Sequence, residues 1–125
     1  MAYYGMELII DLKGCDANLF NRTDIEEYFK QICDLISMKR QRLFFWDYEG
    51  DEKEKAEAPD HLCGTSAVQF IKTSNITLHA LDRLGEVYIN IFSCKDFDTI
   101  KALSFTVEFF KAAKELHSTL DRGGL

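Results

Sequence analysis

The chain has 125 residues, with 15 Lys and Arg against 21 Asp and Glu, so its formal net charge is −6. This length suits one ordinary domain, and a hydrophobic fraction of 46% excludes a disordered chain. The acidic balance argues against bulk nucleic-acid binding, which needs clustered lysine and arginine. Without an apolar run long enough to span a membrane or a signal-peptide pattern, we expect a cytoplasmic protein. We also expect reduced thiols at Cys15, Cys33, Cys63 and Cys94, which form no C-x-x-C pair.

The first half of the chain predicts a strand, a helix and a second strand. Residues 4–12 alternate in the period of a half-buried strand. A helix is expected from Thr23, which would be the N-cap residue with Glu26 completing a capping box. Its apolar face would be formed by Ile25, Phe29, Ile32 and Ile36. Residues 41–48 are aromatic-rich and predict a strand, whereas the charged segment 49–60, which holds the only proline, predicts an exposed loop.

The second half predicts hairpin-linked strands followed by a helix. Strands are expected at residues 65–72, 74–80 and 86–93, with a turn at 82–85. A second helix should begin after Asp98, and a short final strand is expected within 115–122. The apolar stripe of that helix would consist of Ile100, Leu103, Val107 and Phe110.

Strands joined by short links pair antiparallel, so we predict an α+β fold of one domain spanning residues 1–125. It would be a two-layer sandwich, with a mainly antiparallel sheet and two helices on one face. Apolar and aromatic residues also occupy alternate positions that would face away from the helices. We therefore expect a homodimer in which two sheets bury these side chains, namely Ile9, Phe44, Trp46, Tyr88 and Phe92.

Ser74, His79 and Cys94 are the candidate catalytic residues, because they fall on adjacent predicted strands. A hydroxyl, an imidazole and a thiol that converge support nucleophilic or proton-transfer chemistry. Ser74 and His79 are five residues apart and would lie on opposite faces of an ideal strand, unless Ser74 lies in the preceding turn. His79 and Cys94 flank a hairpin, so they can come close across the sheet.

Other interpretations of these residues remain open. A hydrolase would add an orienting carboxylate, for which Asp82 and Asp96 are available. The three residues can equally be a turn serine, a hydrogen-bonded strand histidine and a small buried cysteine. Trp46 and its neighbours can stack on a flat ligand or belong to a core or interface. A zinc site is a further alternative, although no tight ligand spacing supports it; its ligands would be His61, Cys63, His79 and Cys94.

The segment from Lys72 to His79, followed by Phe92-Ser93-Cys94, resembles the short prokaryotic type of S-adenosylmethionine decarboxylase, a pyruvoyl-dependent family of polyamine and spermidine biosynthesis. The resemblance rests on a serine, a histidine five residues later and a cysteine fifteen residues after that. It implies a proenzyme that cuts itself between Thr73 and Ser74, giving chains 1–73 and 74–125.

The same resemblance implies roles for three residues and a cofactor. Ser74 would become the pyruvoyl group, which forms a Schiff base with the amine of the substrate and accepts electrons as CO₂ leaves. His79 would assist the cleavage, and Cys94 would return a proton to the α-carbon. Metal ions have no part in this chemistry, and the substrate would be a small cationic amino acid or a sulfonium compound.

The chain departs from the family pattern at two places. Thr73 and Asn75 flank the serine where the family usually has glutamate and histidine. Arg83 occupies the position of a glutamate that holds ribose hydroxyls, and Asp82 is a neighbouring substitute for substrate binding. Trp46 or Phe45 would take the place of a purine-stacking phenylalanine. The substrate is therefore S-adenosylmethionine, ornithine or arginine, and a third alternative is a homologue that neither cleaves itself nor catalyses.

Overall fold

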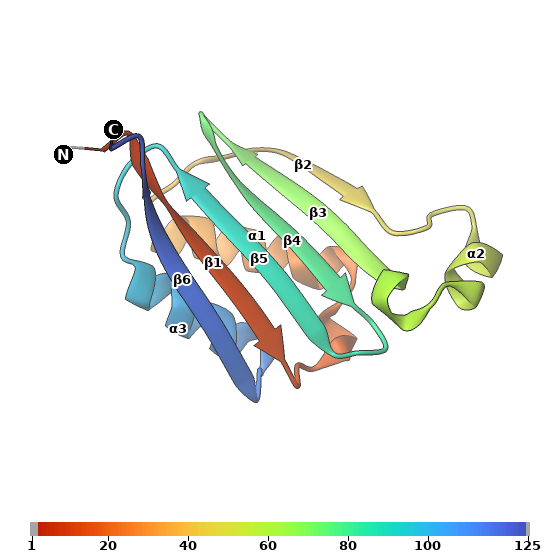
Figure 1. The fold of residues 1–125 in the computed structure, drawn as a ribbon. Helices are drawn as coiled ribbons and strands as arrows, with labels where there is room; N and C mark the ends of the chain where they lie inside the picture. The colour runs from red at the N-terminus through yellow and green to blue at the C-terminus, as the bar shows by residue number, and fades with distance from the viewer. Residues whose placement is uncertain (1–2, 125) are drawn as a thin grey trace.

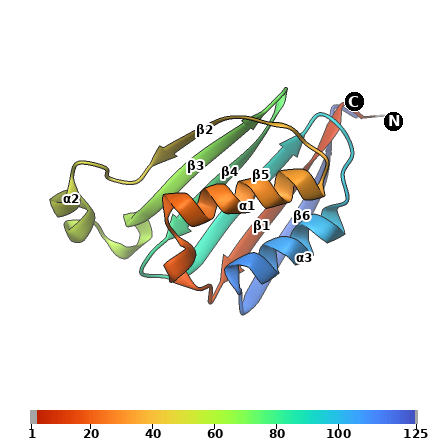
Figure 2. The same cartoon turned by 180° about the vertical axis from the view of Figure 1, so that it is seen from behind.

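The computed structural model describes residues 3–124, which form one six-stranded sheet covered on one face by two helices (Figure 1, Figure 2). The strands are β1 (Gly5–Lys13), β2 (Arg40–Trp46), β3 (Gly64–Ile71), β4 (Ser74–Leu81), β5 (Glu86–Ser93) and β6 (Lys114–Arg122). The helices are α1 (Arg22–Leu35), α2 (Glu52–Glu57) and α3 (Thr99–Phe110), with one-turn 3₁₀ helices η1 (Ala17–Leu19) and η2 (Asp60–Leu62). The strand order is β2-β3-β4-β5-β1-β6, and every pairing is antiparallel. The predicted α+β sandwich is confirmed.

The core lies between the sheet and the pair α1 and α3, which Figure 2 shows in front of the strands. The apolar alternation of β1 places Leu8, Ile10 and Leu12 inward, and all three are fully buried. Tyr28 on α1 is also fully buried, and its hydroxyl pairs with Thr106 Oγ1 on α3 at 2.8 Å. Thr106 Oγ1 donates in turn to the carbonyl of Ala102 at 2.8 Å. This chain of hydrogen bonds satisfies the polar groups between the two helices.

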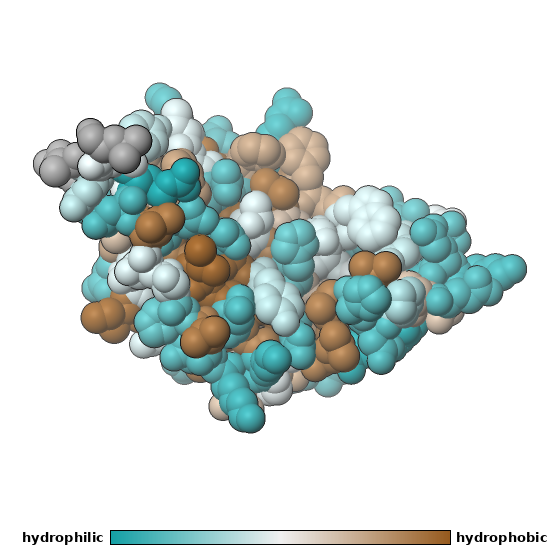
Figure 3. All heavy atoms as spheres, in the orientation of Figure 1, coloured by the Kyte–Doolittle hydropathy of each residue, from teal (hydrophilic) through white to brown (hydrophobic). Residues whose placement is uncertain are grey.

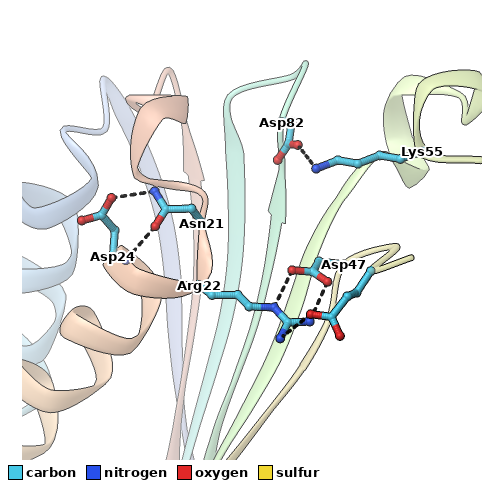
Figure 4. Close-up of polar contacts among 7 residues, drawn as sticks. Asn21, Arg22, Asp24, Asp47, Lys55 and Asp82 are labelled. Atoms are coloured by element: carbon cyan, nitrogen blue, oxygen red, sulfur yellow. Dashed lines mark hydrogen bonds and ion pairs between the residues drawn. The ribbon is translucent and has the colours of Figure 1, made fainter. Parts of the chain in front are cut away.

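Three local predictions are wrong. The first helix begins at Arg22, because Asn21 Oδ1 accepts a hydrogen bond from Asp24 N at 2.9 Å and thereby caps the helix two residues before Thr23 (Figure 4). Ile100 is 77% exposed, because it lies in the first turn of α3, on the side away from the sheet. Residues 49–60 are no simple loop: they contain α2, which is capped by Asp51 Oδ1 accepting from Glu54 N at 3.0 Å.

The second face of the sheet, here called the open face, carries no helix. Its largest exposed apolar side chains are Phe44, Trp46, Phe70, Leu116 and Leu120. Figure 3 shows apolar side chains interspersed with polar ones over this face. Among residues 3–124, no helix has the length and apolar character of a membrane span.

Candidate active site

The turn between β3 and β4 places strain directly before Ser74. Ile71 pairs with Ser74, so Lys72 and Thr73 alone make the turn. Thr73 has φ of 56°, a left-handed conformation that glycine or asparagine normally supplies. A β-branched residue there costs about 1–2 kcal/mol in backbone energy. The bond that the resemblance marks for cleavage therefore follows a strained residue.

Ser74 and Cys94 lie beside one another at the same end of the sheet. Ser74 is the first residue of β4 and is only 6% exposed, on the side of the sheet that faces the helices. Cys94 follows the last residue of β5, and its backbone N–H donates to Ser74 Oγ at 2.9 Å. Ser93 holds this end of the strand in place, since its Oγ accepts from Lys95 N at 3.0 Å and donates to the Lys95 carbonyl at 2.6 Å. Two of the three predicted residues are thus brought together.

The Cys94 thiol has an environment unlike that of the Cys15 and Cys33 thiols. Hydrogen bonds with the Ser74 and Thr73 side chains lower its pKa, and the charge of Lys95 adds to the effect. Burial instead raises the pKa of the Cys15 and Cys33 thiols to about 11. All four cysteines are free of disulfides. Cys94 is therefore the thiol that ionises more readily than a free cysteine.

His79 does not approach Ser74 or Cys94 within one chain. It lies on the open face opposite Tyr88 of β5, whereas Ser74 faces the helices. Five residues of strand also separate the two by about 16 Å at 3.3 Å per residue. Because Ser74 is a regular residue of β4 rather than part of the turn, the parity of the strand holds.

His79 instead pairs with Ser66, a residue that the sequence reasoning missed. Ser66 Oγ and His79 Nδ1 are 2.8 Å apart, on neighbouring strands that align the two residues directly. The signal was present in the spacing, because a two-residue turn at 72 and 73 fixes the register of the whole hairpin. The pair joins an imidazole with a hydroxyl on an exposed surface, which suits proton transfer.

A cavity of about 580 Å³ opens on this face beside the pair. Ser66 and His79 line it, together with Trp46, Tyr48 and Glu54. The Trp46 and Tyr48 rings lie 4.5 Å apart between centroids, and Trp46 is 58% exposed. This size and mixture of aromatic and polar walls suit a small-molecule ligand.

Of the two aromatic residues proposed for stacking, only Trp46 lies at this cavity. Phe45 points to the opposite side of β2 and packs against the core, with the Arg22 guanidinium 5.3 Å from its ring centroid. Arg22 also forms a bidentate pair with Asp47, through Nε to Oδ2 at 2.7 Å and Nη2 to Oδ1 at 2.8 Å (Figure 4). The hydrogen bond from Arg22 lowers the pKa of the Asp47 carboxyl. This pair anchors the chain beyond β2 to the start of α1.

Asp82 and Arg83 secure the segment containing α2 against the turn between β4 and β5. Lys55 Nζ lies 3.2 Å from Asp82 Oδ2, a contact drawn in Figure 4. Arg83 donates to the carbonyls of Ala58 at 2.6 Å, Ala56 at 3.0 Å and Lys55 at 3.2 Å. Its Nη1 also lies 3.2 Å from Asp60 Oδ1. Both side chains therefore have structural partners, and the proposed substrate-binding carboxylate of Asp82 is shared with a lysine.

The residues considered as zinc ligands do not gather. Within the described part of the chain, no group of three or more His, Cys, Asp and Glu side chains has an arrangement that holds a metal ion. His79 in particular lies on the open face, whereas Cys94 lies at the end of the sheet beside Ser74. The geometry thus gives no support to the zinc interpretation.

A sequence model described as S-adenosylmethionine decarboxylase matches residues 6–123. The chain belongs to this family. Similar members of the S-adenosylmethionine decarboxylase family include the proenzyme of Clostridium botulinum, which is 29% identical over 110 residues, covering 86% of this chain and 84% of that protein. The proenzyme of Pyrococcus horikoshii is 24% identical over 121 residues, covering 95% and 78%.

The fold agrees with this membership. The crystal structure of the adenosylmethionine decarboxylase from Aquifex aeolicus matches with a TM-score of 0.76 at 16% identity, covering 97% of this chain and 92% of that one. The resemblance to the S-adenosylmethionine decarboxylase family is confirmed over nearly the whole chain. The roles of Ser74, His79 and Cys94 remain predictions, which the geometry described above makes specific.

Proposed function

We propose that the chain is a self-cleaving, pyruvoyl-dependent decarboxylase of the cytoplasm that acts on S-adenosylmethionine. The observation that carries this proposal is the positive φ of Thr73 directly before Ser74, whose hydroxyl is held by Cys94. The residues fit a pyruvoyl group, because cleavage there would leave position 74 at the new chain start, beside the Cys94 thiol. Such a group supplies a carbonyl that accepts the electrons left by departing CO₂.

The residues around the turn favour attack of Ser74 on the carbonyl of Thr73. Cys94 N–H donates to Ser74 Oγ and holds this oxygen in place, and attack requires a base to take the hydroxyl proton of Ser74. Breaking the Thr73–Ser74 peptide bond releases the strain held by Thr73. Cys94 lies next to the same position, so its thiol is placed to return a proton to a substrate bound there.

We assign the assisting role of His79 to the second copy in a homodimer. Within one chain, Ser74 and His79 lie about 16 Å apart along β4 and on opposite faces of the sheet. The open face carries both the Ser66–His79 pair and exposed apolar side chains such as Phe44 and Phe70. Two open faces packed together bury this apolar surface and bring each imidazole against the partner's open face. The assignment therefore requires Ser74, at the start of β4, to turn from the helix side toward that face.

Co-expression of two inactive chains tests this assignment. A chain with Ser74→Ala keeps His79, and a differently tagged chain with His79→Ala keeps Ser74. If His79 acts across the dimer, the His79→Ala chain is cleaved when the Ser74→Ala chain is present and stays intact alone. Lack of cleavage in verified mixed dimers would place the action of His79 within one chain or remove it from the reaction.

A basic amino acid, ornithine or arginine, is the second candidate substrate. Arg83 favours this candidate, because it stands where the family has a glutamate that accepts from ribose hydroxyls, and a guanidinium group accepts none. Its side chain donates instead to backbone carbonyls. If the partner's open face brings its cavity beside His79 to position 74, as proposed above, that cavity favours S-adenosylmethionine. Its volume of about 580 Å³ lies within the roughly 300–1,000 Å³ of sites for larger organic ligands. Its Trp46 and Tyr48 rings also suit a flat base.

Release of CO₂ from carboxyl-labelled compounds tests the reaction and separates the substrates. We expect release from S-adenosylmethionine, and none from ornithine or arginine, by the wild-type protein. Ser74→Ala should abolish release, whereas Cys94→Ala should allow cleavage but give little correctly protonated product. Release from ornithine or arginine alone would select the second candidate. A fully processed protein that is inactive on all three compounds would contradict both.

A further inference from the structure

Three lysines line a small cavity beside the proposed cleavage point. The cavity measures about 160 Å³ and is lined by Lys39, Lys72 and Lys95, together with Ser74 and Cys94. The lysines come from three separate places: the connection from α1 to β2, the turn before Ser74, and the residue after Cys94. The fold therefore assembles a cluster of positive charge that no single segment contains.

The charge of this cluster is not compensated within residues 3–124. The ion pairs of this part of the chain include none of the three lysines. No aspartate or glutamate among the described residues lines the cavity, and Cys94 is the one thiol in its wall. Lys95 Nζ donates to the carbonyl of Ser37 at 2.9 Å, which fixes this ammonium group across the cavity. Like charges held together repel one another, and a bound anion would relieve the repulsion.

Cleavage of the Thr73–Ser74 bond would create an anion next to this cavity. Ser74 Oγ bonds to the Thr73 carbonyl carbon as the peptide C–N bond breaks, and the hydroxyl proton passes to the nitrogen. Loss of the Ser74 α-proton then breaks the Cβ–Oγ bond, so both oxygens stay on Thr73 as a carboxylate. One water completes the conversion of position 74 to the ketone, and one ammonia leaves. A neutral peptide group is thereby replaced by a negative charge.

We propose that Lys39, Lys72 and Lys95 form a carboxylate-binding site for the new C-terminus at Thr73. This inference rests on the proposed self-cleavage. Thr73 is adjacent to the cavity, since Lys72 and Ser74 on either side of it both line the wall. Holding the cut end there keeps the fragment 1–73 attached at its terminus and fixes the surroundings of Cys94.

The α-carboxylate of the substrate is the other source of the same chemistry, and the reaction argues against it. Decarboxylation turns that carboxylate into neutral CO₂, so lysines that bind it stabilise the starting state more than the transition state. The Thr73 carboxylate is permanent once formed. The three lysines therefore suit a product of maturation better than a group that must lose its charge.

A double variant, Lys39→Gln with Lys95→Gln, tests the site in two backgrounds. In the processed protein we expect the thermal midpoint to fall by about 2–5 °C at low salt, and by less at high salt. In the uncut Ser74→Ala protein, the same substitutions should leave the midpoint unchanged or raise it. The control is Lys101→Gln, which removes an exposed lysine of α3 and should shift neither background.

The possible contradictions separate the site from the proposed function. Equal shifts in the processed and uncut backgrounds would show that the lysines act without regard to the cut, and would overturn the site alone. A large rise in KM without a difference between backgrounds would assign the lysines to the carboxylate of the substrate, which also overturns it. A wild-type chain that remains uncut would overturn the site together with the proposed self-cleavage.

Discussion

Replacing Thr73 with glycine removes the side chain that makes its backbone conformation costly. At φ of 56°, an ordinary L-residue is strained by about 1–2 kcal/mol, and glycine is not. The greater freedom of glycine in the unfolded chain offsets about 0.5–1 kcal/mol of this gain. In the uncut Ser74→Ala background, Thr73→Gly should therefore raise the stability by up to about 1 kcal/mol. For a domain of this size, that corresponds to a thermal midpoint higher by roughly 3–6 °C.

The same substitution should slow self-cleavage in the protein that retains Ser74. If attack on the Thr73 carbonyl releases about 1–2 kcal/mol of strain, its loss lowers the rate roughly 5- to 30-fold. The rate follows from the loss of full-length chain on denaturing gels over time. Thr73→Ala is the matched control, because it removes the hydroxyl that donates to the Lys72 carbonyl at 2.7 Å but keeps a strained L-residue. Cleavage of the glycine variant at the wild-type rate would refute the reasoning.

Three further predictions concern the thiols, the α2 segment and the helix layer. At neutral pH, iodoacetamide should modify Cys94 before Cys33. Hydrogen bonds lower the pKa of the Cys94 thiol, whereas burial raises the pKa of the Cys33 thiol to about 11. Equal modification rates in peptide mapping would contradict this. Arg83→Ala should increase the rate of amide hydrogen exchange in residues 52–62 by about tenfold, because three carbonyl acceptors lose their donor. An unchanged exchange rate would show that other contacts hold α2. Thr106→Val should lower the free energy of unfolding, measured with a chemical denaturant, by about 1–3 kcal/mol, because it leaves the buried Tyr28 hydroxyl without its partner. Tyr28→Phe should lower it by only about 1 kcal/mol, because Thr106 keeps its hydrogen bond to the Ala102 carbonyl. Equal losses would argue against this account.

Local patterns were sufficient for the sheet and for two of the three α-helices. The alternation of β1 and the spacing of Ile25, Phe29 and Ile32 indicate which side of each element is buried. Burial of that apolar side is the largest favourable contribution to folding. The spacing of Thr23 and Glu26 predicts a helix start at Thr23, yet Asn21 caps the helix. The capping box that Thr23 and Glu26 could form therefore does not mark the start of this helix.

The α2 segment and the site geometry depend on contacts between distant residues. Residues 49–60 are charged, and α2 is held by Lys55 on Asp82 and by Arg83, which lie beyond β3 and β4. Nothing within the segment encodes those partners. The strain at Thr73 follows from the pairing of Ile71 with Ser74, which leaves a two-residue turn. The predicted strands 65–72 and 74–80 left one residue between them, so they did not predict this turn. The separation of Ser74 from His79, by contrast, followed from strand parity.

The central claim is that the chain cuts itself before Ser74, and the intact mass of the purified protein tests it most directly. The wild-type protein should resolve into chains of 73 and 52 residues, the smaller with an N-terminus blocked to sequential degradation. The Ser74→Ala protein should remain a single chain of about 14.4 kDa. A wild-type protein that stays at full length after prolonged incubation, with an intact Thr73–Ser74 bond, would contradict the account.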